Sequence, residues 1–142
     1  MLIDANLLIY SRDEESPFHA AALSWFSTQL NGERPVGIAW SSILAFLRVM
    51  TNPRITVSPL TANEAWETVD SWFSSPVVWT PVPTDRHRDL LGTFVTSLDL
   101  TAKLVPDAHL AALAVEHGLE VCSADSDFAR FPGLRWRNPL AG

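Results

Sequence analysis

Residues 1–5, Met-Leu-Ile-Asp-Ala, form a short apolar run broken by an aspartate. This run predicts a buried strand with Asp4 at its end. Residues 119–127, Leu-Glu-Val-Cys-Ser-Ala-Asp-Ser-Asp, repeat the pattern of an apolar strand followed by carboxylates. In open parallel sheets, ligands bind outside the carboxyl ends of the strands. Both segments therefore mark one edge of a sheet as the candidate site.

The chain between these segments alternates helical and extended patterns. Helices are predicted over residues 18–30, 41–50, 61–73, 84–98 and 107–117, and extended pieces over 35–40, 77–79 and 134–137. From residue 6 to Tyr10 the apolar residues simply continue, and no helix is predicted there. Short strands separated by amphipathic helices predict an α/β fold with a short parallel sheet and helices on both faces. We expect a single domain over residues 1–142.

Composition narrows the function classes. With 47% hydrophobic residues in 142, the chain can build a core without disulfides, and its one cysteine excludes a disulfide framework or a Cys-rich zinc site. A net charge of −6 excludes a broad basic face for nucleic acid, so such binding must be local. Without a signal-peptide pattern or a span-length apolar run, we expect a cytoplasmic protein with no membrane association.

Three separated segments bring aspartates to the same edge of the predicted sheet. Asp4 follows the first strand, Asp125 and Asp127 follow the strand ending at Ser123, and Asp107 opens a helix after Pro106. Clustered carboxylates repel one another, and a hard divalent cation such as Mg²⁺ or Mn²⁺ removes that repulsion. Such an ion activates water for phosphodiester hydrolysis. Taken singly, Asp107 also fits an ordinary helix-terminal acid, and Asp125 an Asx turn.

Histidines and aromatic residues are interpreted more plainly. His19 and His87 are predicted to be solvated surface residues, and His109 to lie on a helix face near the site. The stripe of Trp66, Trp72 and Phe73 is predicted to belong to the core or an interface. Six tryptophans exceed the needs of a core this size. We therefore expect some of these aromatic side chains in an interface with a second copy or a partner.

Three motifs together resemble one family. Residues 1–10, 105–114 and 122–131 are similar to PIN-domain proteins, and more narrowly to VapC-type toxins of bacterial toxin–antitoxin pairs. Residues 40–54, which include Phe-Leu-Arg-Val and Thr-Asn-Pro-Arg, share this resemblance. It covers essentially the whole chain and implies a PIN-like three-layer sandwich.

The resemblance implies a Mg²⁺- or Mn²⁺-dependent endoribonuclease that cuts structured RNA such as tRNA or rRNA. It implies homodimers and inhibition by a small VapB-type antitoxin. Carried over by position, Asp4, Asp107 and Asp125 would be the catalytic metal ligands, with Asp127 supporting them. Asn6 would orient Asp4 or its water. We expect the phosphate contacts to come from arginines in nearby segments: Arg12, Arg48, Arg54 and Arg130.

One position departs from the family pattern. The family usually carries a glutamate before a Phe/Val-Leu-Arg run, and here Ala45 precedes Phe46-Leu47-Arg48. Weaker metal binding, a water in place of the ligand, or loss of activity would follow, with Ser41 or Ser42 as a possible hydroxyl donor. An alternative function is therefore an inactive protein of this fold that still binds an antitoxin. A receiver-type phosphoryl-transfer domain is disfavoured, because the only lysine, Lys103, follows no predicted strand.

Overall fold

A computed structural model describes residues 1–141, and the predicted domain extends one residue beyond that part. Five short strands form one parallel sheet in the order β3-β2-β1-β4-β5. The strands are β1 (Leu2–Ile3), β2 (Val36–Gly37), β3 (Val78–Trp79), β4 (Glu120–Cys122) and β5 (Arg135–Arg137). The helices are α1 (Ala5–Arg12), α2 (His19–Leu30), α3 (Trp40–Met50), α4 (Ala62–Phe73), α5 (His87–Ser97) and α6 (Leu104–His117).

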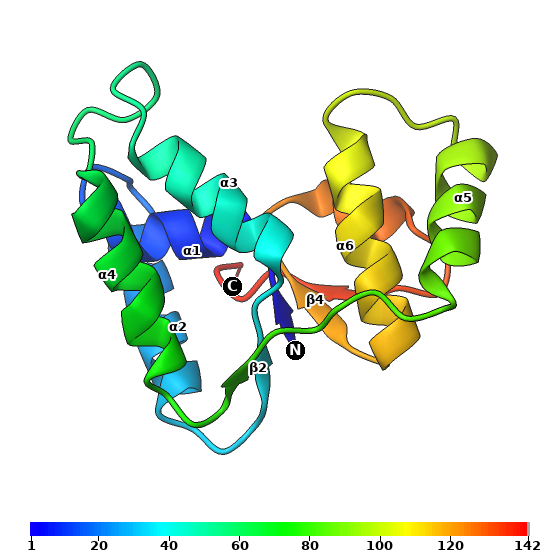
Figure 1. Ribbon diagram of the computed structural model, residues 1–142, viewed down its shortest axis with the longest axis horizontal. Coiled ribbons are helices and arrows are strands. Elements are labelled where there is room, and N and C mark those ends of the chain that lie inside the picture. Colours follow the sequence, from blue (N-terminus) through cyan, green and yellow to red (C-terminus); the bar gives the residue numbers. More distant parts are fainter. Residues whose placement is uncertain (142) are drawn as a thin grey trace.

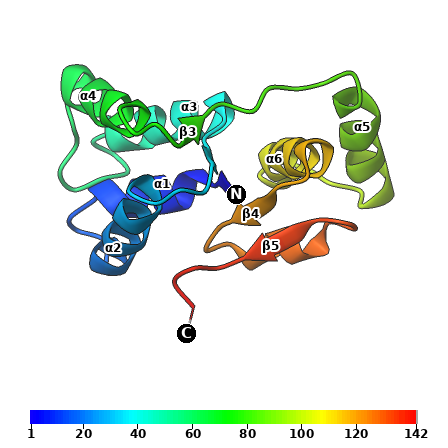
Figure 2. The same cartoon turned by 90° about the horizontal axis from the view of Figure 1, so that it is seen from below.

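The helices cover both faces of this sheet, which confirms the predicted α/β sandwich. In Figure 1, α1 to α4 lie on one side of the strands and α5 and α6 on the other; Figure 2 shows the same separation from below. Because successive strand residues point to opposite faces, Leu2 packs with the α5–α6 core while Ile3 packs with the α1–α4 core. Both side chains are fully buried.

The strand order places the candidate site. β1 lies in the middle of the sheet, with β2 on one side and β4 on the other. The chain runs from β1 to β2 through α1 and α2, and from β3 to β4 through α5 and α6 on the opposite face. Such a reversal of direction opens a crevice at the carboxyl ends of the neighbouring strands β1 and β4.

One helix was not predicted, and the starts of α5 and α6 each differ from the prediction by three residues, at His87 instead of residue 84 and at Leu104 instead of Asp107. Residues 5–12 form α1, where no helix was predicted, and Asp4 caps it by accepting a hydrogen bond from Ala5 N–H at 2.8 Å. Helix α6 begins at Leu104 rather than Asp107, so Pro106 lies inside the first turn, where its missing N–H removes no helical hydrogen bond. The end of α6 is as predicted, with Gly118 in a left-handed conformation, φ 67°.

Within residues 1–141, no helix is both long enough and apolar enough to cross a bilayer.

Candidate active site

Asp4 lies where β1 ends and α1 begins. Its backbone N–H donates to the carbonyl of Cys122 at 2.9 Å, which continues the pairing of β1 with β4. Its extended backbone lets the side chain turn back over the first turn of α1. One carboxylate oxygen is thereby engaged by Ala5 N–H, and the other faces the end of β4.

Ser123 is the centre of the hydrogen bonds that join the two strand ends. Its fully buried hydroxyl donates to Asp4 Oδ2 at 2.7 Å. Ser123 Oγ also accepts hydrogen bonds from Asn6 Nδ2 at 3.1 Å and from the Asp125 N–H at 3.0 Å. Asn6 therefore holds Asp4 indirectly, through the Ser123 hydroxyl. No role for Ser123 was predicted from the sequence.

Three further carboxylates converge beside this network. Asp107 from α6, with Asp125 and Asp127 from the segment after β4, place one oxygen each within 4.8 Å of one another. Asp125 also caps the 3₁₀ turn over Ser126–Arg130 by accepting from Asp127 N–H at 2.9 Å. The parallel sheet thus brings together the acidic residues that the sequence singled out.

Burial and the closeness of the carboxylates to one another raise the pKa of Asp107. Burial and the negative charges of the other three aspartates raise the pKa of Asp107 to about 7. Burial also raises the pKa of Asp4, although hydrogen bonds from Ser123 and Ala5 oppose that rise. Carboxylates that repel one another when all are ionised are suited to sharing a cation, because the cation offsets their negative charges. Their oxygen donors fit a hard ion such as Mg²⁺ or Mn²⁺.

A small hollow adjoins the acidic cluster on the α3 side. It has a volume of about 70 Å³, which is room for more than one water molecule. Asp4 and Asp107 line it together with Ser41, Ser42 and Ala45 from the first half of α3. Ser42 donates its hydroxyl to the Ile3 carbonyl at 3.3 Å, so Ser41 has the freer hydroxyl of the two.

The four arginines predicted to contact RNA phosphates lie on different elements, and not all of these elements border the acidic cluster. Arg48 is exposed on the same face of α3 as Ser41 and Ala45, and Arg130 is exposed at the end of the turn carrying Asp127. Arg54 is exposed in the loop after α3. Arg12 ends α1, roughly 12 Å along that helix from Asp4, and lines a groove with Glu64 and Glu67.

The prediction for His87 was wrong, because it is buried rather than solvated. Its Nδ1 pairs with the carboxylate of Glu116, and its Nε2 lies 3.0 Å from His109 Nδ1. His109 thus turns toward α5. Burial would raise the pKa of Glu116, but hydrogen bonds from Thr84 N–H and His87 outweigh it and lower that pKa. The sequence carried no signal for this contact, because the two partners are 29 residues apart.

The aromatic side chains divide between core and surface. Trp72 is buried against Phe26 and Phe46. Trp40 and Trp66 are about half exposed, at 51% and 49%. These two rings lie outside the core, and their place in an interface with a second copy or a partner stays a prediction.

Comparisons of the sequence with known proteins agree on one protein family. The model of the family described as PIN domain matches residues 1–134. Ribonuclease VapC37 of Mycobacterium tuberculosis is 42% identical over 140 residues, which span 99% of this chain and 97% of that protein. Ribonuclease VapC31 of the same species is 36% identical over 141 residues, 97% of each chain.

Solved structures share the fold at low sequence identity. VapBC-1 from nontypeable Haemophilus influenzae superposes with a TM-score of 0.70 at 12% identity, over 99% of this chain and 98% of that one. DNA-bound VapBC from Salmonella typhimurium gives 0.69 at 17% identity, over 97% and 96%. This likeness concerns the arrangement of strands and helices.

Proposed function

The chain belongs to the PIN-domain family, and we propose that it is a VapC-type endoribonuclease that hydrolyses structured RNA with a divalent metal ion. The observation that carries this proposal is the convergence of Asp107, Asp125 and Asp127 within 4.8 Å, beside Asp4. The VapC ribonucleases it resembles over nearly their full length support the activity. tRNA or rRNA, in the cytoplasm, is the proposed substrate.

We assign the ion to the four aspartates: Asp4, Asp107, Asp125 and Asp127. A bound Mg²⁺ or Mn²⁺ supplies charge neutralisation at a phosphoryl group and a more acidic water. Ser123 and Ala5 N–H fix both oxygens of Asp4, so this ligand is held in place before substrate arrives. Asn6 orients Ser123 and, through it, Asp4.

RNA contacts are proposed for a few cations rather than a broad basic face. Arg48 and Arg130 are exposed on elements that border the acidic cluster, and their planar forks suit phosphate oxygens. Arg12 and Arg54 stay as proposed contacts for parts of the RNA farther from the cut bond.

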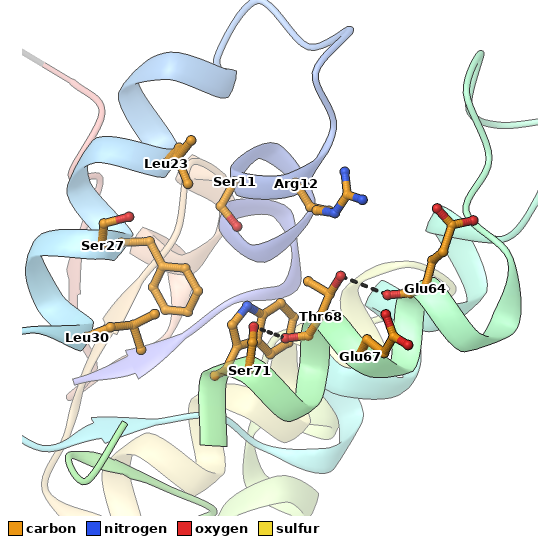
Figure 3. A pocket seen from close by; sticks show the side chains of 11 residues that line it. Ser11, Arg12, Leu23, Ser27, Leu30, Glu64, Glu67, Thr68 and Ser71 are labelled. Atoms are coloured by element: carbon orange, nitrogen blue, oxygen red, sulfur yellow. Dashed lines mark hydrogen bonds between the residues drawn. The ribbon is translucent and has the colours of Figure 1, made fainter. Parts of the chain in front are cut away.

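We propose that a VapB-type antitoxin segment occupies the groove between α2 and α4. The groove encloses about 510 Å³. Its walls are apolar at Leu23 and Leu30, while Arg12, Glu64 and Glu67 lie at its other end (Figure 3). A segment with apolar anchors and a basic residue matches these walls. The related solved complexes are named for both proteins of a VapBC pair.

We propose that the chain forms a homodimer through the outer face of α3. Trp40 and Leu44 are one helical turn apart and are 51% and 61% exposed. Covering two such side chains in a second copy would remove apolar surface from water. Sedimentation at micromolar concentration tests this, and Leu44→Asp should shift the chain toward monomer.

A second candidate function is an antitoxin-binding protein with little catalytic activity. The observation that favours it is Ala45, which brings no ligand to the hollow shared by Asp4 and Asp107. Antitoxin binding without RNA cleavage at millimolar Mn²⁺ would support this candidate against the first.

The experiment is cleavage of total RNA by purified protein in chelator, in Mg²⁺ and in Mn²⁺, with new 5′ ends mapped by sequencing. We expect discrete ends that appear only with a divalent ion. Cleavage in chelator at the same sites would contradict the metal-dependent mechanism.

A further inference from the structure

The connection between α5 and α6 holds an unusual backbone conformation next to the acidic cluster. Asp99 and Ala102 both have φ 50°, in the left-handed region that non-glycine residues rarely adopt. Leu100, between them, is buried at 7% exposure and anchors the connection in the α5–α6 core. Lys103 follows Ala102 directly and leads into α6, four residues before Asp107.

Lys103 is the only lysine of the chain, and its ammonium lies beside the proposed metal ligands. Its Nζ is 3.8 Å from Asp127 Oδ2. Its positive charge also counteracts the rise in the pKa of Asp107. Within residues 1–141, no other lysine or arginine forms an ion pair with the four aspartates.

This ion pair holds the lysine only loosely. The Lys103 side chain is 84% exposed, and the distance is near the upper limit for an ion pair. Exposed pairs of this kind contribute little to folding. The ammonium is therefore free to leave Asp127, on a flexible stem that carries a compact charge.

A mobile cation at this place would assist the proposed reaction. Four carboxylates and one divalent ion leave a net negative charge, and an RNA phosphate that approaches them adds another. A divalent ion at the cluster also repels the ammonium from Asp127. A cation that is displaced by the ion and stays within reach is then available to the phosphate.

We propose that Lys103 is an RNA-binding residue of this site. It neutralises Asp127 when the site lacks its ion, and it contacts an RNA backbone phosphate when ion and RNA are bound. This inference rests on the proposed function. It predicts two effects of opposite sign when the charge is removed: tighter metal binding and weaker RNA binding.

The test compares Lys103→Met with two matched variants. Lys103→Arg keeps the charge, and Arg34→Met removes an exposed cation at the other end of the sheet, just before β2. Mn²⁺ affinity is measured by calorimetry at low salt. RNA affinity is measured by fluorescence anisotropy of a labelled single-stranded RNA in saturating Mn²⁺, with the intactness of the RNA checked on gels.

For Lys103→Met we expect Mn²⁺ to bind roughly three- to tenfold more tightly, because one nearby positive charge is removed. RNA should bind several-fold more weakly, and the slope of log affinity against log salt should fall by about 0.7, as for one lost phosphate contact. Lys103→Arg and Arg34→Met should match the wild type in Mn²⁺ affinity.

The outcomes separate this inference from the proposed function. If the wild type binds Mn²⁺ and RNA but Lys103→Met behaves as Arg34→Met does, the role of Lys103 is overturned and the ribonuclease proposal stands. If Lys103→Met weakens both ligands, the lysine has a structural role and the inference is also overturned. If the wild type binds no Mn²⁺, the proposed function fails and the inference fails with it.

Discussion

The Ser123 hydroxyl donates a 2.7 Å hydrogen bond to Asp4 Oδ2 across 119 residues of sequence. It joins the end of β4 to the end of β1 and fixes the carboxylate that we propose as a metal ligand. Because the hydroxyl also accepts from Asn6 and from the Asp125 N–H, it is the common partner of both acidic segments.

Ser123→Ala should therefore destabilise the fold and weaken the site. The substitution leaves a buried carboxylate oxygen and two donors without their partner, which costs about 1–3 kcal/mol. Urea denaturation in chelator measures this loss. Ser126→Ala, at an exposed position in the next turn, is the matched control and should change the unfolding free energy by less than about 0.5 kcal/mol. Equal effects of the two substitutions would show that the Ser123 network is unimportant.

Stability without metal should depend on pH through Asp107. Its pKa is about 7 in the folded chain, against 3.8 ordinarily. The folded state therefore binds more protons than the unfolded state between these values, and stability falls as pH rises through this window. Thermal melts in chelator from pH 4 to 8 measure the trend.

Asp107→Asn should flatten the pH trend and raise the melting temperature in chelator near pH 8. Saturating Mn²⁺ should also reduce the trend in the wild type, because the ion favours the ionised carboxylates. A wild-type profile that does not change with Mn²⁺ would place the ion away from Asp107.

Ala45→Glu should affect stability with opposite signs in the two metal states. Without metal, a fifth carboxylate beside Asp4 and Asp107 adds repulsion and lowers stability by about 1 kcal/mol or more. With Mn²⁺ the new carboxylate adds a ligand and should raise the melting temperature. Ala45→Gln has the same shape without the charge, so it controls for the loss of the hollow. The same shift for Ala45→Glu in chelator and in Mn²⁺ would mean that Ala45 does not face the ion.

Glu116 and His87 should stabilise the contact between α5 and α6. His87→Ala leaves the Glu116 carboxylate with Thr84 N–H but without its histidine partner, which costs about 1–2 kcal/mol. Because the pKa of Glu116 is lowered from 4.5, its contribution is present above pH 4.5 and is lost as the pH falls below that value. Urea denaturation at pH 7 and pH 4 should show a smaller effect of His87→Ala in acid, and an equal effect would contradict the pairing.

The fold could be predicted because its signals are local. The strand before Asp4 and the strand before Ser123 are short apolar runs, and α3, α4 and α5 between them carry clear amphipathic stripes. A parallel sheet with β1 beside β4 places both strand ends, with Asp4 and Asp125, at one edge, whereas the position of Asp107 also depends on how α6 packs on the sheet. Helix α1 was missed because its apolar residues are consecutive and follow closely on those of β1, so they show no helical period.

Contacts between distant side chains could not be predicted in the same way. The role of Ser123 depends on the register of β1 against β4, and the burial of His87 depends on how α5 packs on α6. Arg12 was expected near the cluster because it follows the first motif, but a helix of eight residues carries it to the α2–α4 groove. Each of these outcomes is set by tertiary packing rather than by local pattern.

The central claim is that these aspartates hold the divalent ion on which RNA cleavage depends. The most direct measurement is RNA cleavage at increasing Mn²⁺ by the wild type, by Asp125→Asn and by Asp70→Asn, an exposed carboxylate on α4 as control. Our account predicts Mn²⁺-dependent cleavage by the wild type and Asp70→Asn, and at least a hundredfold slower cleavage by folded Asp125→Asn. Cleavage by Asp125→Asn at the wild-type rate and with the same Mn²⁺ dependence would contradict it.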